Sequence, residues 1–248
     1  MWRVFLIFSS TLFIANAVLA REMHFVTYEA PPFVSESLPE QGAAIYALRQ
    51  MLKKGDCELK ITFAPFLRGR KLAMKDESVI GFFPVTQVNV TPEFTMSKVV
   101  YQTPWVFAER KDNPILWKKP EDILPYKIGN ASGYEMAVSF QRLHKEKKLK
   151  LEPASTDELN LLKLANKRVD LVFIDAGIFA YLLKTSEKLK PYQNQLQLNS
   201  KVIHMDQYGV AFKKTPRAIK EMENFNKLAS EEEFTRHVEA YFKKYPGP

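Results

Sequence analysis

The stretch that decides the fold is Asn166–Asp175, which reads NKRVDLVFID. Its pattern predicts the end of a helix, a tight turn, and a short strand that is apolar from Leu171 to Ile174. Ligands of open α/β sheets bind in the crevice beyond the carboxyl ends of the strands, so Asp175 lies where a ligand would bind. The alternative is that Asp175 only caps the helix that follows.

The N-terminal part of the chain alternates strands and helices. The predicted order of elements is a strand, a helix, a strand, a helix and a strand, over Met23–Tyr28, Gly42–Leu52, Leu59–Phe63, Phe66–Met74 and Val79–Phe83. This order is typical of a parallel sheet covered by helices.

The same alternation restarts after an extended segment, Val99–Phe107. The further predicted elements are Tyr126–Gly129 (strand), Gly133–Leu143 (helix), Lys150–Glu152 (strand), a helix from the capping sequence Ser155–Glu158 to Ala165, the strand into Asp175, Ile178–Leu183 (helix), Val202–Phe212 (extended), and closing helices Ala218–Leu228 and Glu231–Tyr245 with Ser230 as N-cap. We therefore expect two similar α/β units, one inserted in the other.

The first twenty residues have the pattern of a secretory signal peptide. Arg3 precedes an apolar run over Val4–Ile14, and Val18 and Ala20 suit the positions before a cut after Ala20. The run is short for a membrane span and no second one follows, so we expect a periplasmic chain without a membrane anchor. The single cysteine, Cys57, does not follow the cut site, which excludes a lipid anchor there, and we expect it to be buried.

The net charge of +8 does not indicate a nucleic-acid partner. The lysines are dispersed and often alternate with glutamates, as in His144–Lys147, whereas nucleic-acid modules concentrate basic residues on one stripe. The four histidines lack metal-ligand spacing, and no phosphate loop or nucleophile elbow occurs. We expect no metal, no cofactor, no nucleic acid and a monomer.

Five segments, in this order, resemble the bacterial extracellular solute-binding proteins of family 3, the periplasmic receptors typified by binders of polar amino acids. These segments are Tyr28–Phe33 with its Pro-Pro-Phe, Pro120–Gly129, Asn166–Asp175, Tyr208–Phe212 and Asn224–Leu228. Together they extend over nearly the whole chain after the leader.

The resemblance implies the type 2 periplasmic binding fold, a venus flytrap of two α/β lobes, each a mainly parallel sheet flanked by helices. Residues 21–107 and 206–248 would form lobe 1, and residues 108–205 would form lobe 2. Two hinge strands would lie near Val106–Arg110 and His204–Tyr208, and the lobes would close around a ligand.

In proteins of this family, a carboxylate of the second lobe holds the ligand's ammonium group, and Asp175 matches that position. Backbone amides of the second lobe and an arginine of the first hold the α-carboxylate. Ser132, Gly133 and Tyr134 match the amide-bearing turn, although they also fit a plain helix start.

The family's arginine is missing here. Its expected region is Thr86–Glu93, where Asn89 or Thr91 stands nearest to the family's position and neither brings a charge. Thr86 is also a candidate binding residue. Arg68 is the alternative cation that could hold a ligand carboxylate. The other interpretation of Arg68 is that it lies on the surface of a helix. An ordinary α-amino acid ligand is therefore in doubt.

Aromatic and acidic residues complete the expected site. The resemblance places Phe66 where an aromatic ring stacks on the ligand, with core packing as the alternative. Tyr28, Glu29 and Phe33 lie in the first cleft loop, where Glu29 either takes a ligand cation or is solvated. Trp105 and Trp117 fit either the cleft mouth or ordinary packing.

Three functions fit this sequence. The first is a non-enzymatic receptor that passes a small polar solute, amino-acid-like or amine-containing, to an ABC-type transporter. The second is an enzyme on the same scaffold, dehydratase-like, with Glu29 or Asp175 as acid or base. The third is an orphan sensor or interaction protein, because fold does not fix function.

Overall fold

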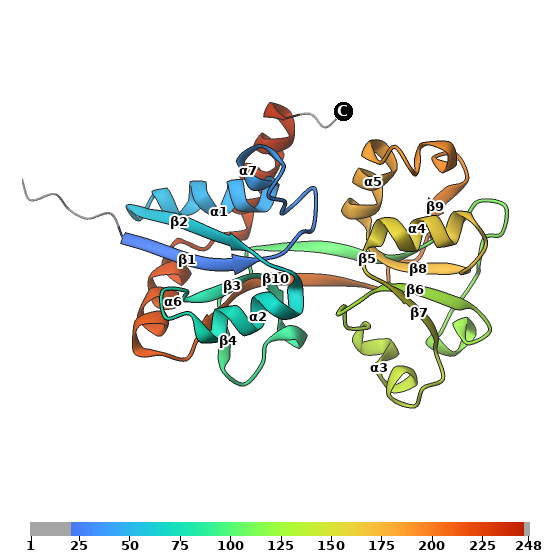
Figure 1. The fold of residues 1–248 in the computed structure, drawn as a ribbon, viewed down its shortest axis with the longest axis horizontal. Helices are drawn as coiled ribbons and strands as arrows, with labels where there is room; N and C mark the ends of the chain where they lie inside the picture. The colour runs from blue at the N-terminus through green and yellow to red at the C-terminus, as the bar shows by residue number, and fades with distance from the viewer. Residues whose placement is uncertain (1–20, 246–248) are drawn as a thin grey trace, which may run out of the picture.

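A computed structural model describes residues 21–245. The signal-peptide prediction therefore lies outside the described residues. The described chain forms a mixed α/β structure with two lobes, which lie side by side in Figure 1 and are joined by two long strands.

The first lobe contains both ends of the described chain. Its elements are β1 (Arg21–Thr27), α1 (Ala43–Lys53), β2 (Cys57–Phe63), α2 (Phe66–Lys75), β3 (Gly81–Thr86), β4 (Phe94–Met96), α6 (Pro216–Leu228) and α7 (Glu231–Lys244). Strand β1 pairs in parallel with β2 and β3, as the alternation of strands and helices predicted.

The second lobe repeats this plan. Its elements are β6 (Lys127–Ala131), α3 (Val138–Lys145), β7 (Lys150–Ala154), α4 (Asp157–Ala165), β8 (Leu171–Asp175), α5 (Ala176–Thr185) and β9 (Leu196–Leu198). Strand β6 pairs in parallel with β7 and β8. Four short 3₁₀ turns also occur among the described residues, at Pro39–Gln41, Gln87–Asn89, Pro120–Ile123 and Lys190–Tyr192.

Two strands, β5 (Tyr101–Arg110) and β10 (His204–Lys213), run from one lobe into the other. They pair with each other in antiparallel fashion over Tyr101–Trp105 and His204–Tyr208. Strand β5 then pairs with β8 of the second lobe, and β10 pairs with β3 and β4 of the first. The sheet order β2-β1-β3-β10-β5-β8-β6-β7 is therefore continuous through the junction. The exact lobe boundaries stay a prediction.

Each lobe has its own aromatic core. Phe25, Phe83 and Phe212 are buried in the first, and Phe107, Phe140 and Phe173 in the second. Fully burying a side chain of this size contributes about 1.5–3 kcal/mol. The larger apolar cluster continues from the first lobe into the second, where it includes Val172 and Ile174 of β8. Cys57 is buried, as expected. None of the described helices has the length and apolar content that a membrane crossing requires.

Helix α3 begins later than the sequence predicted. The predicted start was Gly133, but the helix begins at Val138. Gly133 has a φ of +95°, and the amide of Tyr134 donates to the carbonyl of Ala131, which makes a turn there instead. The Ser132–Tyr134 turn therefore does not stand at a helix N-terminus. The short strands β4 and β9 were not predicted from the sequence.

Candidate functional site

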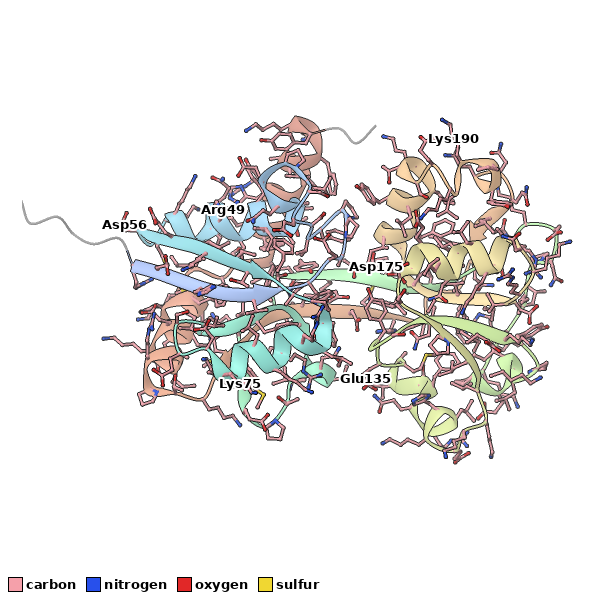
Figure 2. The ribbon with its side chains drawn as sticks, in the orientation of Figure 1. Arg49, Asp56, Lys75, Glu135, Asp175 and Lys190 are labelled. Carbon is pink, nitrogen blue, oxygen red and sulfur yellow. The ribbon has the colours of Figure 1, made fainter. Side chains whose placement is uncertain are left out.

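Two connected pockets lie between the lobes. The inner pocket, of about 50 Å³, reaches the paired strands β5 and β10, and the outer pocket, of about 740 Å³, opens over the first turn of α4. Both are lined by Tyr28, Phe66 and Tyr134, which come from different lobes. Figure 2 places Asp175 and Glu135 at the junction, whereas Asp56 lies at the far end of the first lobe and Lys190 at the top of the second.

Asp175 caps the following helix and also lines the inner pocket. Its Oδ1 accepts hydrogen bonds from the amides of Gly177 (2.7 Å) and Ile178 (3.0 Å), so it caps α5. It also lines the inner pocket, and its side chain is only 2% exposed. The strand β8 ends here opposite Trp105 of β5, which fixes the carboxylate at the junction.

Burial raises the pKa of the Asp175 carboxyl, while the Thr103 hydroxyl and the two capping amides lower it. The nearby charge of Asp206 raises it further. A cation placed in the inner pocket would relieve both effects, because it would compensate the lost hydration and the repulsion between carboxylates.

Of the other predicted residues, Phe33, Thr86 and Asn89 also line the inner pocket, where Asn89 donates to the Thr86 hydroxyl (2.9 Å). Ser132, Arg68 and Glu29 line the outer pocket. Gly133 lies beside the ring of Phe66, since a Cβ there would be 3.4 Å from Phe66 Cδ1. The structure thus brings the predicted residues together. Their role in ligand binding stays a prediction.

Several of these residues already have partners within the protein. Glu29 is exposed, and its carboxylate accepts from the amide of Glu36 (2.8 Å) within the same loop. The amide and hydroxyl of Ser132 both donate to the carbonyl of Ala154, at 2.8 and 3.0 Å.

Aromatic rings form much of the wall. Tyr28 packs edge-on against Phe66, with centroids 5.0 Å apart, and Trp105 packs edge-on against Tyr134 at 5.3 Å. Trp105 lines the inner pocket and donates from Nε1 to the hydroxyl of Tyr208 (3.0 Å). Trp117 instead packs against Phe107 and Phe140, so it belongs to the second-lobe core.

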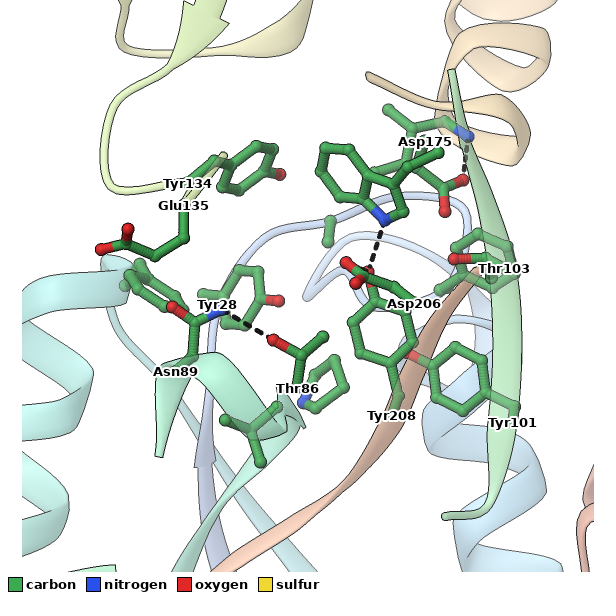
Figure 3. A pocket seen from close by; sticks show the side chains of 17 residues that line it. Tyr28, Thr86, Asn89, Tyr101, Thr103, Tyr134, Glu135, Asp175, Asp206 and Tyr208 are labelled. Carbon is green, nitrogen blue, oxygen red and sulfur yellow. Dashed lines mark hydrogen bonds between the residues drawn. The ribbon is translucent and has the colours of Figure 1, made fainter. Parts of the chain in front are cut away.

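Five acidic residues that line these pockets were not predicted as site residues from the sequence, and Asp206 and Asp157 are the two with the clearest role in the geometry. Asp206 lines the inner pocket, and its Oδ1 lies 2.8 Å from Nε2 of His204. Figure 3 shows Asp175 and Asp206 on one side of this pocket, across from Tyr28, Thr86 and Asn89. The position of Asp206 on a strand that crosses the junction was the available signal.

Asp157 is the second of these two residues, and it lines the outer pocket. The hydroxyl of Thr156 caps α4 by accepting from the amide of Leu159, so the cap lies one residue later than the predicted Ser155 and Asp157 takes the first helical position. Burial raises the pKa of Asp157 to about 7, with a smaller contribution from Asp175, while its hydrogen bond from Tyr134 lowers it.

Neither the family models nor the curated proteins give a match to this chain. Solved structures do. The GluR0 ligand-binding core from Nostoc punctiforme, in complex with L-glutamate, superposes with a TM-score of 0.68 at 16% identity, over 91% of this chain and 100% of that one. An ancestral arginine-binding protein bound to arginine gives 0.68 at 20% identity, over 91% and 98%.

A histidine kinase sensor domain with similarity to periplasmic binding proteins gives a TM-score of 0.69 at 14% identity, over 92% of this chain and 97% of that one. These similarities show that the chain has the two-lobe, type 2 periplasmic binding fold. The predicted fold class is confirmed.

Proposed function

We propose that this chain is an exported solute-binding protein that captures a small, polar, amine-bearing solute between its lobes. The observation that carries the proposal is the position of Asp175, a buried carboxylate in the interlobe pocket with aromatic rings of both lobes around it. The solved relatives bound to glutamate and arginine support a role in binding amino-acid-like solutes. Delivery to an ABC-type transporter in the periplasm is part of the proposal.

Binding requires that the lobes approach, and the contacts across the junction support this. Phe33 of the first lobe lies against Gly177 of the second, and Phe66 of the first lies beside Gly133 of the second. The paired strands β5 and β10 are the covalent connections around which the lobes would move.

A screen of thermal stability tests the proposal. Amino acids, amines and small carboxylates are each added to the purified chain, and a ligand at 100 times its dissociation constant stabilises the folded state by about 2.7 kcal/mol. We expect at least one amine-bearing solute to raise Tm by several degrees. A flat response to every solute would overturn the proposal.

Catalysis is a second candidate function, and the property of Asp157 is the observation that favours it. A carboxyl whose pKa is about 7 in a cleft has the property that general acids and bases need at neutral pH. The same screen separates the two functions, because each solute that raises Tm is then incubated with the chain and analysed for conversion. Unchanged solute supports binding alone, and turnover supports the enzyme.

A further inference from the structure

The charge of the cleft is opposite to that of the whole chain. The chain carries +8, yet the two pockets are lined by seven acidic side chains: Glu29, Glu36, Glu135, Asp157, Glu158, Asp175 and Asp206. Among the described residues, Arg68 is the only arginine or lysine lining either pocket, and it is exposed. A cleft with this lining attracts cations and repels anions.

Several of the groups that would hold a ligand carboxylate are already engaged within the protein. Within the Ser132–Tyr134 turn, the amide of Ser132 donates to Ala154 (2.8 Å) and that of Tyr134 to Ala131 (3.1 Å). Thr86 and Asn89 are uncharged and hydrogen-bonded to each other. A carboxylate in the inner pocket would meet Asp175 and Asp206 without a compensating cation from the described residues that line it.

The outer pocket contains a carboxylate oxygen that needs a partner. Asp157 is nine-tenths buried, and its Oδ2 accepts from the Tyr134 hydroxyl (3.2 Å). Its Oδ1 is fully buried and has no hydrogen-bond partner in the part of the chain that the structure describes. A buried unpaired carboxylate oxygen is costly, so a donor bound in the outer pocket would gain a strong interaction.

Tyr28 connects the two acidic regions. Its ring lines both pockets and packs against Phe66. Burial raises the pKa of the Tyr28 phenol, and the charges of Asp206, Asp175 and Asp157 raise it further, in that order. The three carboxylates therefore all act on one side chain, from the inner and outer pockets together. Aromatic faces beside such carboxylates favour alkylammonium groups.

We infer that the ligand is a dication without a carboxylate, an alkyl diamine. One ammonium group binds Asp175 and Asp206 in the inner pocket (Figure 3), the other binds Oδ1 of Asp157 in the outer pocket, and the alkyl chain lies along Tyr28 and Phe66. This inference rests on the proposed function and adds Asp157 and Asp206 to the binding residues. His204 already contacts Asp206, so the inner ammonium group either binds Asp206 beside the His204 ring or replaces that ring as the partner of the carboxylate.

Isothermal titration with matched amines tests the ligand class. 1,4-Diaminobutane and L-ornithine differ only by the carboxylate, and 1-aminobutane lacks the second ammonium. We expect the diamine to bind at least tenfold more tightly than either. Equal or tighter binding of L-ornithine would overturn the inference and leave the proposed function intact. Binding of L-glutamate without binding of the diamine would also overturn the inference and leave the proposed function intact. No binding by any solute would contradict both.

The role of Asp157 has its own test. Asp157→Asn should lower the affinity for 1,4-diaminobutane at least tenfold. The affinity for 1-aminobutane, which needs only the inner pocket, should stay nearly unchanged. Glu187→Gln, at an exposed position, is the matched control and should change neither. An equal loss of affinity for 1,4-diaminobutane and 1-aminobutane would overturn the assignment of the second ammonium group to Asp157. If the variant does not fold, the comparison of diamine with L-ornithine on the unchanged chain still decides the inference.

Discussion

The hydroxyl of Tyr134 donates a hydrogen bond of 3.2 Å to Oδ2 of Asp157. Tyr134 follows β6 and Asp157 begins α4, so this contact joins two segments of the second lobe at the cleft. It satisfies one oxygen of a buried carboxylate, and the other has no hydrogen-bond partner among the described residues. Burial and this bond have opposite effects on the pKa of Asp157, and burial is the larger.

The raised pKa of Asp157 predicts a specific dependence of stability on pH. The carboxyl titrates at about 7 in the folded chain and near 4 when unfolded, so the folded state binds more protons in that interval. The free energy of unfolding should therefore fall as the pH rises from about 4 to about 7, by an amount on the order of a few kcal/mol. Urea unfolding across this range measures it.

Asp157→Asn should remove the part of that fall that Asp157 contributes, because the amide does not titrate, whereas Asp175, whose pKa burial also raises, still contributes. Glu187→Gln should keep the pH profile of the unchanged chain, since its side chain is exposed. Identical pH profiles for Asp157→Asn and the unchanged chain would show that Asp157 is not the group responsible.

The same group predicts how diamine binding depends on pH. A cation prefers the ionised form of Asp157, so affinity for 1,4-diaminobutane should rise about tenfold between pH 6 and pH 8. The rise should nearly disappear in Asp157→Asn. Titration calorimetry at both pH values measures it, and an equal rise in both proteins would assign the titration to another residue.

Two substitutions at Asp175 separate its structural and binding roles. Asp175→Ala removes the cap of α5 and should cost about 1 kcal/mol of stability, whereas Asn is as good an N-cap as Asp. Both variants should lose the ligand-induced rise in Tm, because both remove the buried charge. An undiminished rise in Asp175→Asn would refute the assignment of Asp175 as a ligand carboxylate.

Tyr208→Phe should destabilise the junction between the lobes. Nε1 of Trp105 donates to the Tyr208 hydroxyl at 3.0 Å, and both side chains are nearly buried. Without that hydroxyl the indole donor is left unpaired, which costs about 1–3 kcal/mol. Urea unfolding measures the loss. Tyr126→Phe, in a half-buried ring of the second lobe, is the control, and equal losses would contradict the role of the bond.

Gly177→Ala should hold the lobes apart. A Cβ at this position would lie 2.8 Å from Cζ of Phe33, which belongs to the other lobe. Ligand affinity should fall severalfold and the radius of gyration from X-ray scattering should rise, while α5 itself tolerates alanine. The second substitution Phe33→Leu should restore affinity by removing the clash. Failure to restore it would indicate that alanine disturbs the Asp175 cap instead, since the Cβ is also 3.1 Å from Oδ1.

Local patterns explain which parts of the fold were predictable. The strand into Asp175 is β8, and Ser230 caps α7 by accepting from the amide of Glu233. These features depend on residues close in sequence, so periodicity and capping patterns find them. The predicted start of α3 was wrong, because backbone hydrogen bonds around Gly133 make a turn where the sequence favoured a helix. One of these bonds goes to β7.

The candidate site was only partly accessible from sequence. The family resemblance selected residues on both sides of the cleft, but it did not name Asp157 or Asp206 as site residues, although it placed a hinge strand over Asp206. Asp157 enters the site because the cap of α4 is Thr156, and Asp206 because β10 pairs with β5 at the junction. The pairing of β10 with β5 has no local signature, and the capping sequence Ser155–Glu158 did not show which of its residues would be the cap.

The sequence by itself determined the alternation of strands and helices, the position of Asp175 after a buried strand, and the absence of an arginine between Arg70 and Arg110. Only the tertiary structure decided that three carboxylates act on Tyr28 and that the amides of Ser132 and Tyr134 are engaged. The electrostatic potential in the cleft depends on the distances between charged groups on segments that are remote in the chain. Those distances are set by the packing of the two lobes around β5 and β10.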